Sequence, residues 1–138
     1  MVSGADSPVD AFLAAVEAGA MDSCSVWSGD AVLDATVPNW RFRRQGPAAI
    51  RAEYRGWFAD PGRFEELRRL PTAGGEVVAY LLTWVENGVP HAAHHVHVLD
   101  VDAGRITADT VVCGGRWPAG LLAEIQAAQE AQDTRVGA

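Results

Sequence analysis

Apolar positions near the start of the chain recur at the spacing of one buried helix face. That face would carry Val9, Phe12, Leu13 and Val16. Ser7 can cap such a helix, Pro8 suits its first position and Gly19 suits its end, so a helix is predicted between Ser7 and Gly19. A second short helix is predicted over residues 21–28, with Trp27 on its buried side.

The middle of the chain switches between strand-like and helix-like patterns. Residues 31–37 are apolar and partly β-branched, which predicts a strand, and residues 40–45 fit a return strand or a loop. A further helix is predicted from Gly46 to the turn at residues 60–62. Its apolar face would carry Ile50, Tyr54, Trp57 and Phe58. Residues 64–70 fit either a helix or a strand.

Three strand-like runs dominate the second half of the chain. Residues 76–86 form the first run, and the Asn87-Gly88 pair behind it is typical of a hairpin turn. Residues 91–100 and 105–113 follow, joined by the short turn at residues 102–104. A last helix is predicted from Pro118, and the polar tail from Gln129 onward is predicted to fray. That helix would present Leu121, Leu122 and Ile125.

Helices followed by a meander of long strands predict an α+β fold. The helices would pack on one face of a curved antiparallel sheet and leave a cone whose mouth suits a small molecule. The length of 138 residues predicts a single domain over residues 1–138, with a core at about residues 8–128.

Composition and charge narrow the classes of partner. Hydrophobic residues make up 49% and charged residues 21%, which is typical of a globular domain. A net charge of −7 argues against nucleic acid. No apolar run is long enough for a membrane helix, and the first six residues do not resemble a signal peptide, so a cytoplasmic protein is expected. Cys24 and Cys113 suggest neither a disulfide scaffold nor a zinc site.

The candidate chemistry lies in the last hairpin. A three-residue loop would place His97 opposite Asp109 and His95 opposite Val111, all on one face of the sheet. An imidazole beside a carboxylate is a common pair for moving protons near neutral pH. His95, His97 and Asp109 would make an incomplete metal shell, so neither a metal nor another cofactor is expected.

Several motifs, in order, resemble the nuclear transport factor 2-like superfamily. They are Asp30-Ala-Val-Leu, Pro38, Gly46-Pro-Ala-Ala-Ile50, Tyr54, Trp84-Val-Glu-Asn-Gly88, His97-Val-Leu and Gly104-Arg105-Ile106. Over roughly residues 8–118 the chain looks most like the SnoaL-like polyketide cyclases and the ketosteroid isomerase-like proteins. The resemblance implies a cone-shaped sheet with N-terminal helices on its concave face. It also implies an inward set of Val78, Tyr80, Leu82, Trp84, His95, His97, Asp109, Val111 and Cys113.

The resemblance transfers the family's sites unevenly. His97 stands where the isomerases carry an oxyanion-binding aspartic acid, and His95 or His97 with Asp109 resembles the acid/base pair of the cyclases. The isomerases' base aligns with Asn39, or near Asp34 or Ala35 in another alignment. Their N-terminal tyrosine aligns with Ala15, so a standard steroid isomerase is not expected, and the paired aspartates around an arginine of limonene epoxide hydrolase-like proteins find no match.

These features suggest a small cofactor-independent enzyme that acts on a hydrophobic cyclic or polyketide-like carbonyl compound. Asp109 would move the proton, His97 would bind the enolate oxygen or act as partner acid, and Asn39 would orient the substrate. The expected substrate-binding walls are Trp40, Tyr54, Trp57, Phe58, Tyr80, Leu82, Trp84 and Val111. A non-catalytic binding protein and a dimerisation domain with a filled cone are the alternatives.

The outward positions of the strand over residues 76–86 are also nearly apolar. They are Val77, Ala79, Leu81, Thr83 and Val85. A sheet whose back faces water should alternate with polar residues, so this back is predicted to be covered by a second copy, giving a homodimer through the outer face.

Overall fold

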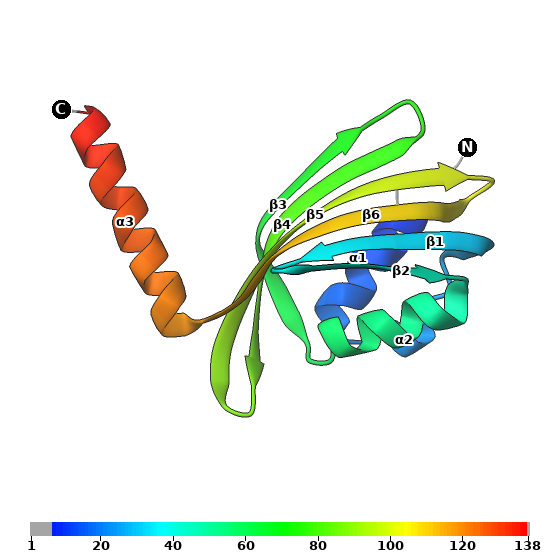
Figure 1. Cartoon of the computed structure of the whole chain (residues 1–138), viewed down its shortest axis with the longest axis horizontal. Coiled ribbons are helices and arrows are strands. Elements are labelled where there is room, and N and C mark those ends of the chain that lie inside the picture. Colours follow the sequence, from blue (N-terminus) through cyan, green and yellow to red (C-terminus); the bar gives the residue numbers. More distant parts are fainter. Residues whose placement is uncertain (1–6, 138) are drawn as a thin grey trace.

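Two helices lie on the concave face of one strongly curved sheet in the computed structural model, which describes residues 7–137 (Figure 1). The elements are α1 (Pro8–Ala18), the short 3-10 helix η2 (Met21–Ser23), β1 (Trp27–Val37), β2 (Trp40–Gln45), α2 (Pro47–Trp57), β3 (Gly62–Pro71), β4 (Gly75–Glu86), β5 (Val89–Asp102), β6 (Arg105–Pro118) and α3 (Ala119–Gly137). The predicted α+β class is confirmed. The first six residues, to which the signal-peptide prediction applies, lie outside the described residues.

The strand order places the histidine hairpin at the centre of the sheet. The six strands run β2-β1-β6-β5-β4-β3. Neighbouring strands are antiparallel except β1 and β6, which are parallel. Because β6 lies between β1 and β5, it has a strand on each side and its inward side chains are enclosed by the cone.

The N-terminal elements follow the predicted pattern only in part. Ser7 caps α1 by accepting a hydrogen bond from the Val9 amide, and Gly19 ends the helix with a left-handed φ of 63°. The predicted second helix over residues 21–28 is wrong, because η2 is short and β1 already begins at Trp27. Trp27 is nevertheless buried, since it pairs with Ile106 of β6 and its ring packs into the core.

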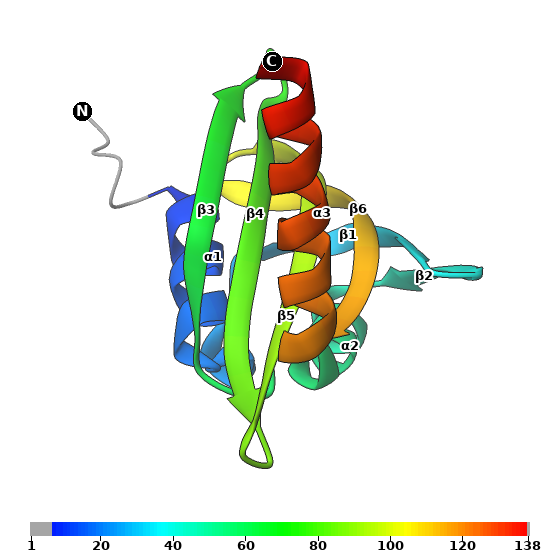
Figure 2. The same ribbon diagram turned by 90° about the vertical axis from the view of Figure 1, so that its left-hand side faces the viewer.

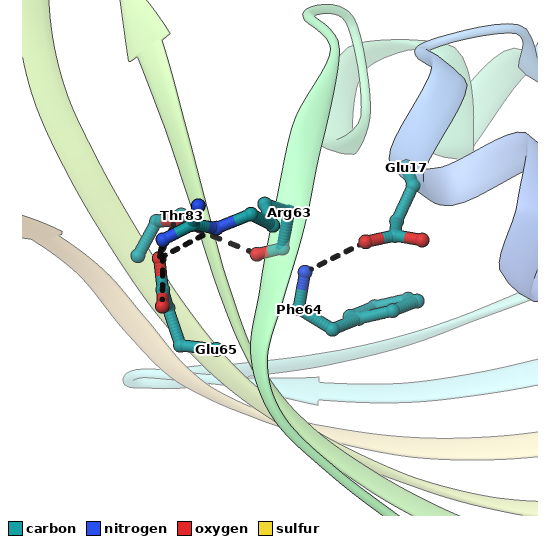
Figure 3. A network of polar contacts seen from close by, with 5 residues as sticks. All are labelled: Glu17, Arg63, Phe64, Glu65 and Thr83. Atoms are coloured by element: carbon teal, nitrogen blue, oxygen red, sulfur yellow. Dashed lines mark hydrogen bonds and ion pairs between the residues drawn. The ribbon is translucent and has the colours of Figure 1, made fainter.

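Strand β3 resolves the ambiguity over residues 64–70 in favour of a strand. Its pairing with β4 shifts register between Phe64 and Glu66. At this irregularity the Phe64 amide donates a hydrogen bond of 2.9 Å to Glu17 of α1, while Glu65 pairs with Arg63 and Thr83 (Figure 3). The contact fastens α1 to the sheet edge and holds the Phe64 ring 4.8 Å from the ring of Tyr80.

The last hairpin has a different register from the predicted one. Asp102 pairs with Arg105, so the turn has two residues, and a further irregularity follows between Asp100 and Val101. His97 therefore pairs with Val111 rather than with Asp109, and His95 pairs with Cys113. Each departure moves the register by one residue, and together they preserve the face on which the side chains lie.

The concave face forms the core of the protein. The predicted inward residues of β4 are all buried: Val78, Tyr80, Leu82 and Trp84. On the opposite face Val98 is 44% and Val112 is 52% exposed. Helix α3 lies on that outer side of the sheet (Figure 2) and projects away from it (Figure 1). It remains helical beyond Gln129, where fraying was predicted. No helix within the described residues has the length and apolar character needed to cross a bilayer.

The homodimer stays a prediction, and the exposed outer face offers a direct test. Light scattering should report a dimer for the wild type, and Val112→Arg should convert it to a monomer, because two added charges would be buried in the interface. Trp40→Arg is the control, since Trp40 is 71% exposed on the β1–β2 hairpin. A monomeric wild type at micromolar concentration would refute the prediction.

Candidate functional site

A cavity of about 470 Å³ opens on the concave side, beside the end of α2. It is lined by Val37, Pro38, Gly56, Trp57, Trp84, Ala93, His95, Cys113, Gly115 and Arg116. The wall is largely apolar, with one imidazole, one thiol and one guanidinium among its side chains. A small hydrophobic molecule with one polar group matches this composition and volume.

His95 is the polar side chain that joins the cavity to the interior. It is 3% exposed, and its ring packs against Trp57 and Phe58 with centroid distances of 5.3 and 5.7 Å. Its Nδ1 atom lies 2.9 Å from the hydroxyl of Tyr80, its direct partner across β4 and β5. Nδ1 is thus engaged, and Nε2 has no hydrogen-bond partner among the described residues.

Behind His95 lies a continuous network of buried polar side chains. The Tyr80 hydroxyl also lies 2.9 Å from Nε2 of His97, and Nδ1 of His97 lies 2.9 Å from Oδ1 of Asp109. The second carboxylate oxygen of Asp109 accepts a hydrogen bond of 2.5 Å from Tyr54 of α2. Five residues therefore form a single chain of hydrogen bonds. Four of them lie on strands β4, β5 and β6, and the fifth lies on helix α2.

The prediction that His97 and Asp109 lie within hydrogen-bond distance inside the cone is confirmed. Both side chains are completely buried. They are diagonal neighbours on the sheet, because Asp109 pairs directly with Leu99. Neither residue lines the cavity. The direct contact between Asp109 and a substrate that the sequence suggested is therefore absent, since both of its oxygens are already engaged in the interior.

The aromatic surroundings fix the network in place. Phe12 of α1 packs edge-on against the His97 ring at 5.3 Å, and the rings of Tyr80 and His97 stack at 5.5 Å. Tyr54 in turn contacts Trp57 and Phe58. Such packing excludes water, and it strengthens electrostatic interactions within the network.

Burial sets the protonation states of several of these groups. Burial, with smaller contributions from the neighbouring His97 and His94, lowers the pKa of His95 to about 3, so His95 is neutral at neutral pH. Burial, together with the charge of Asp109, raises the pKa of both Tyr54 and Tyr80 well above 10. Both hydroxyls therefore keep their protons and remain donors. Burial also raises the pKa of the Cys113 thiol, which keeps it protonated.

The remaining predicted site residues divide into three groups. Trp57 and Trp84 line the cavity, as expected of substrate-binding walls. Phe58, Leu82 and Val111 are buried in the core behind it: they are at most 2% exposed.

The third group, Asn39 and Trp40, lies outside the cone. Asn39 lies in the β1–β2 turn with a positive φ of 65°, and Trp40 is exposed beside it. The alternative first-strand residue Asp34 points outward, where Arg41 lowers its pKa through an ion pair. Ala35 points inward and carries no polar group. The inward placement of Asn39 and the wall position of Trp40 are therefore wrong, because the strand turns at these residues and leaves them in solvent.

Sequence reasoning missed the polar roles of the two tyrosines and the position of Arg116. Tyr54 and Tyr80 were expected to be apolar walls, whereas their hydroxyls hold Asp109 and link the two histidines. Arg116 lies at the cavity, ion-paired with Glu86 and 5.7 Å from the Trp84 ring. Among the described residues, no group of three His, Cys, Asp or Glu side chains is arranged to hold a metal ion.

Known structures of similar shape identify the fold. A candidate isomerase from Bacillus subtilis superposes with a TM-score of 0.64 and 19% identity, covering 78% of this chain and 84% of its own. A candidate polyketide cyclase from Xanthomonas campestris pv. campestris gives 0.63 and 18%, covering 76% and 86%. An NTF-2-like protein of unknown function from Burkholderia xenovorans LB400 gives 0.56 and 23%, covering 78% and 80%. The chain has the NTF2-like fold.

The identities with these NTF2-like structures are too low to carry function from one chain to another. No protein-family model matches the sequence, and no curated protein does.

Proposed function

We propose that this protein is a cofactor-independent enzyme that removes a proton next to the carbonyl of a hydrophobic cyclic or polyketide-like compound. Cyclisation, isomerisation and dehydration of such compounds can all begin with this step. The observation that carries the proposal is His95, a neutral imidazole on the wall of an apolar cavity, with a buried carboxylate network behind it.

His95 is the base in this proposal. A neutral imidazole with Nδ1 engaged presents Nε2 to the cavity, and a base must lie within reach of the proton it takes. Trp57 and Trp84 form apolar walls beside it, which exclude water from the reacting atoms. His95 thus takes the role of proton acceptor that was expected for Asp109. Asp109 acts through the hydrogen-bond network behind His95.

Arg116 provides positive charge for the developing enolate. Its guanidinium lines the same cavity as His95 and is held by Glu86 and by the face of Trp84. A fixed cation near the oxygen that gains charge stabilises the enolate-like transition state more than it stabilises the neutral ketone. It therefore lowers the barrier to proton removal. The names of the Bacillus and Xanthomonas proteins, a candidate isomerase and a candidate polyketide cyclase, agree with this class of reaction.

The test uses a probe ketone and does not need the natural substrate. In deuterium oxide the α-protons of 2-tetralone should exchange faster with the wild-type protein than in buffer, as followed by proton NMR. His95→Gln should reduce this exchange by about a hundredfold or more, the usual scale of acid/base catalysis. The matched control is His94→Gln, because His94 directly precedes His95 in β5 and lies on the opposite face of the sheet.

The second candidate is a non-catalytic binding protein with the same cavity. It predicts that 2-tetralone binds, as seen in chemical-shift changes of cavity residues, while its α-protons exchange no faster than in buffer. That result would overturn the proposed function. Equal exchange by wild type and His95→Gln would retain an enzyme and remove His95 as its base.

A further inference from the structure

The hydrogen bonds from Asp109 to His95 have a direction that the chemistry of the groups determines. Tyr80 bears one hydroxyl proton but contacts an imidazole nitrogen on each side, at 2.9 Å from His95 and 2.9 Å from His97. It can donate to only one of them, so the other must donate to it. The two histidines therefore have opposite roles toward Tyr80.

The carboxylate of Asp109 determines which histidine donates. As an ion it only accepts, and it accepts from Tyr54 at one oxygen and from Nδ1–H of His97 at the other. A neutral His97 then has a bare Nε2, which accepts from the Tyr80 hydroxyl. The Tyr80 oxygen accepts from Nδ1–H of His95, and Nε2 of His95 is left bare.

We propose that the positive charge which His95 would gain with the substrate proton does not stay on His95 but passes, through Tyr80, to the His97–Asp109 pair. The inference rests on the proposed function, because it says how that base is strengthened. The C–H bond of the substrate breaks and an Nε2–H bond forms on His95, and the electron pair stays on the substrate as an enolate. The Nδ1 proton of His95 passes to Tyr80, and the Tyr80 proton passes to Nε2 of His97.

Atoms and charge balance across this step. Before it, the network carries one negative charge on Asp109; afterwards His97 is an imidazolium beside the Asp109 carboxylate, and the network is neutral. His95 and Tyr80 end as neutral groups, with His95 now protonated at Nε2. A charge placed on His95 itself would be costly at 3% exposure, whereas neutralising a buried carboxylate is favourable.

The groups around the network do not offer a competing base. Tyr54 and Cys113 face it as protonated, neutral groups, and the rings of Phe12, Phe58 and Phe64 complete the enclosure. Glu53 lies near Tyr54 and accepts a hydrogen bond from the indole N–H of Trp57. His94 lies on the outer face of β5. The relay through Tyr80 is thus the hydrogen-bonded route from His95 to Asp109 within the described residues.

Imidazole ¹⁵N spectra of the ligand-free protein test the direction without any substrate. Near pH 8 both His95 and His97 should carry their proton on Nδ1 and show a bare Nε2. As the pH falls, the first proton taken up should appear as a charged His97 together with a neutral His95 that has switched to Nε2–H. A resting His95 already protonated at Nε2, or a His95 that becomes charged before His97, would overturn the inference.

Tyr80→Phe breaks the chain and leaves the ring in place. In this variant protonation of His97 should no longer switch the tautomer of His95, and exchange of 2-tetralone should fall at least about tenfold, a part of the acid/base effect. Binding of 2-tetralone should be unchanged, because Tyr80 does not line the cavity.

The two proposals can fail separately. If Tyr80→Phe exchanges 2-tetralone at the wild-type rate while His95→Gln does not, His95 is a base but the relay is wrong. If the wild type does not exchange 2-tetralone at all, the proposed function fails, and the ¹⁵N spectra still decide whether the hydrogen bonds run in the inferred direction.

Discussion

Asp109→Asn should lower the rate of α-proton exchange of 2-tetralone by about a hundredfold or more, although the Asp109 side chain does not contact the substrate. Asparagine is nearly isosteric but uncharged. The network would then be neutral at rest and would gain a buried positive charge on taking up a proton, which its apolar surroundings disfavour. A proton leaving the substrate would therefore find a much weaker base at His95.

Exchange rates and circular dichroism measured on the same samples separate this effect from misfolding. Asp102→Asn is the matched control, since it makes the same chemical change in the exposed residue beside the β5–β6 turn. We expect it to leave the rate unchanged. A folded Asp109→Asn protein with the wild-type rate would show that the buried carboxylate has no part in proton removal.

Among the substitutions proposed for this protein, Phe12→Ala should lower the free energy of unfolding the most. Phe12 is fully buried, and its ring packs against Trp27, Tyr54, Phe58 and His97. Removing so large a ring leaves a cavity between α1 and the sheet, and the free energy of unfolding should fall by about 3–5 kcal/mol. Urea denaturation measures the change.

Leu67→Ala is the control for that measurement. Leu67 is 43% exposed on the edge strand β3, so its truncation should change the free energy of unfolding by about 0.5 kcal/mol or less. Equal effects of the two substitutions would contradict the packing of α1 on the concave face of the sheet.

The sequence was most informative where periodicity and a turn motif acted together. The helical spacing from Val9 to Val16 predicted α1, and the inward face of β4 followed from alternation and the family resemblance. The Asn87-Gly88 turn also contained unused information. A two-residue hairpin turn there pairs Tyr80 with His95, which would have placed the hydroxyl beside the imidazole.

Other features depend on contacts that local sequence does not encode. The irregularity between Asp100 and Val101 shifts the β5–β6 register, and no glycine or proline stands at this position to indicate it in the sequence. The local pattern around Trp27 predicts a helix, but Trp27 belongs to β1 because it pairs with Ile106, which lies far along the chain. Asn39 was assigned to the site through an alignment of the first strand, and that alignment could not foresee a turn with a positive φ at this residue.

The most direct measurement is the exchange of 2-tetralone by His95→Ala in the presence and absence of imidazole. Alanine leaves a space that opens into the cavity, and small imidazoles can enter it to replace the missing base. The account predicts background exchange without imidazole, and saturable recovery as neutral imidazole is added, with no such response in the wild type. Exchange by His95→Ala at the wild-type rate without added imidazole would contradict the claim that His95 is the base.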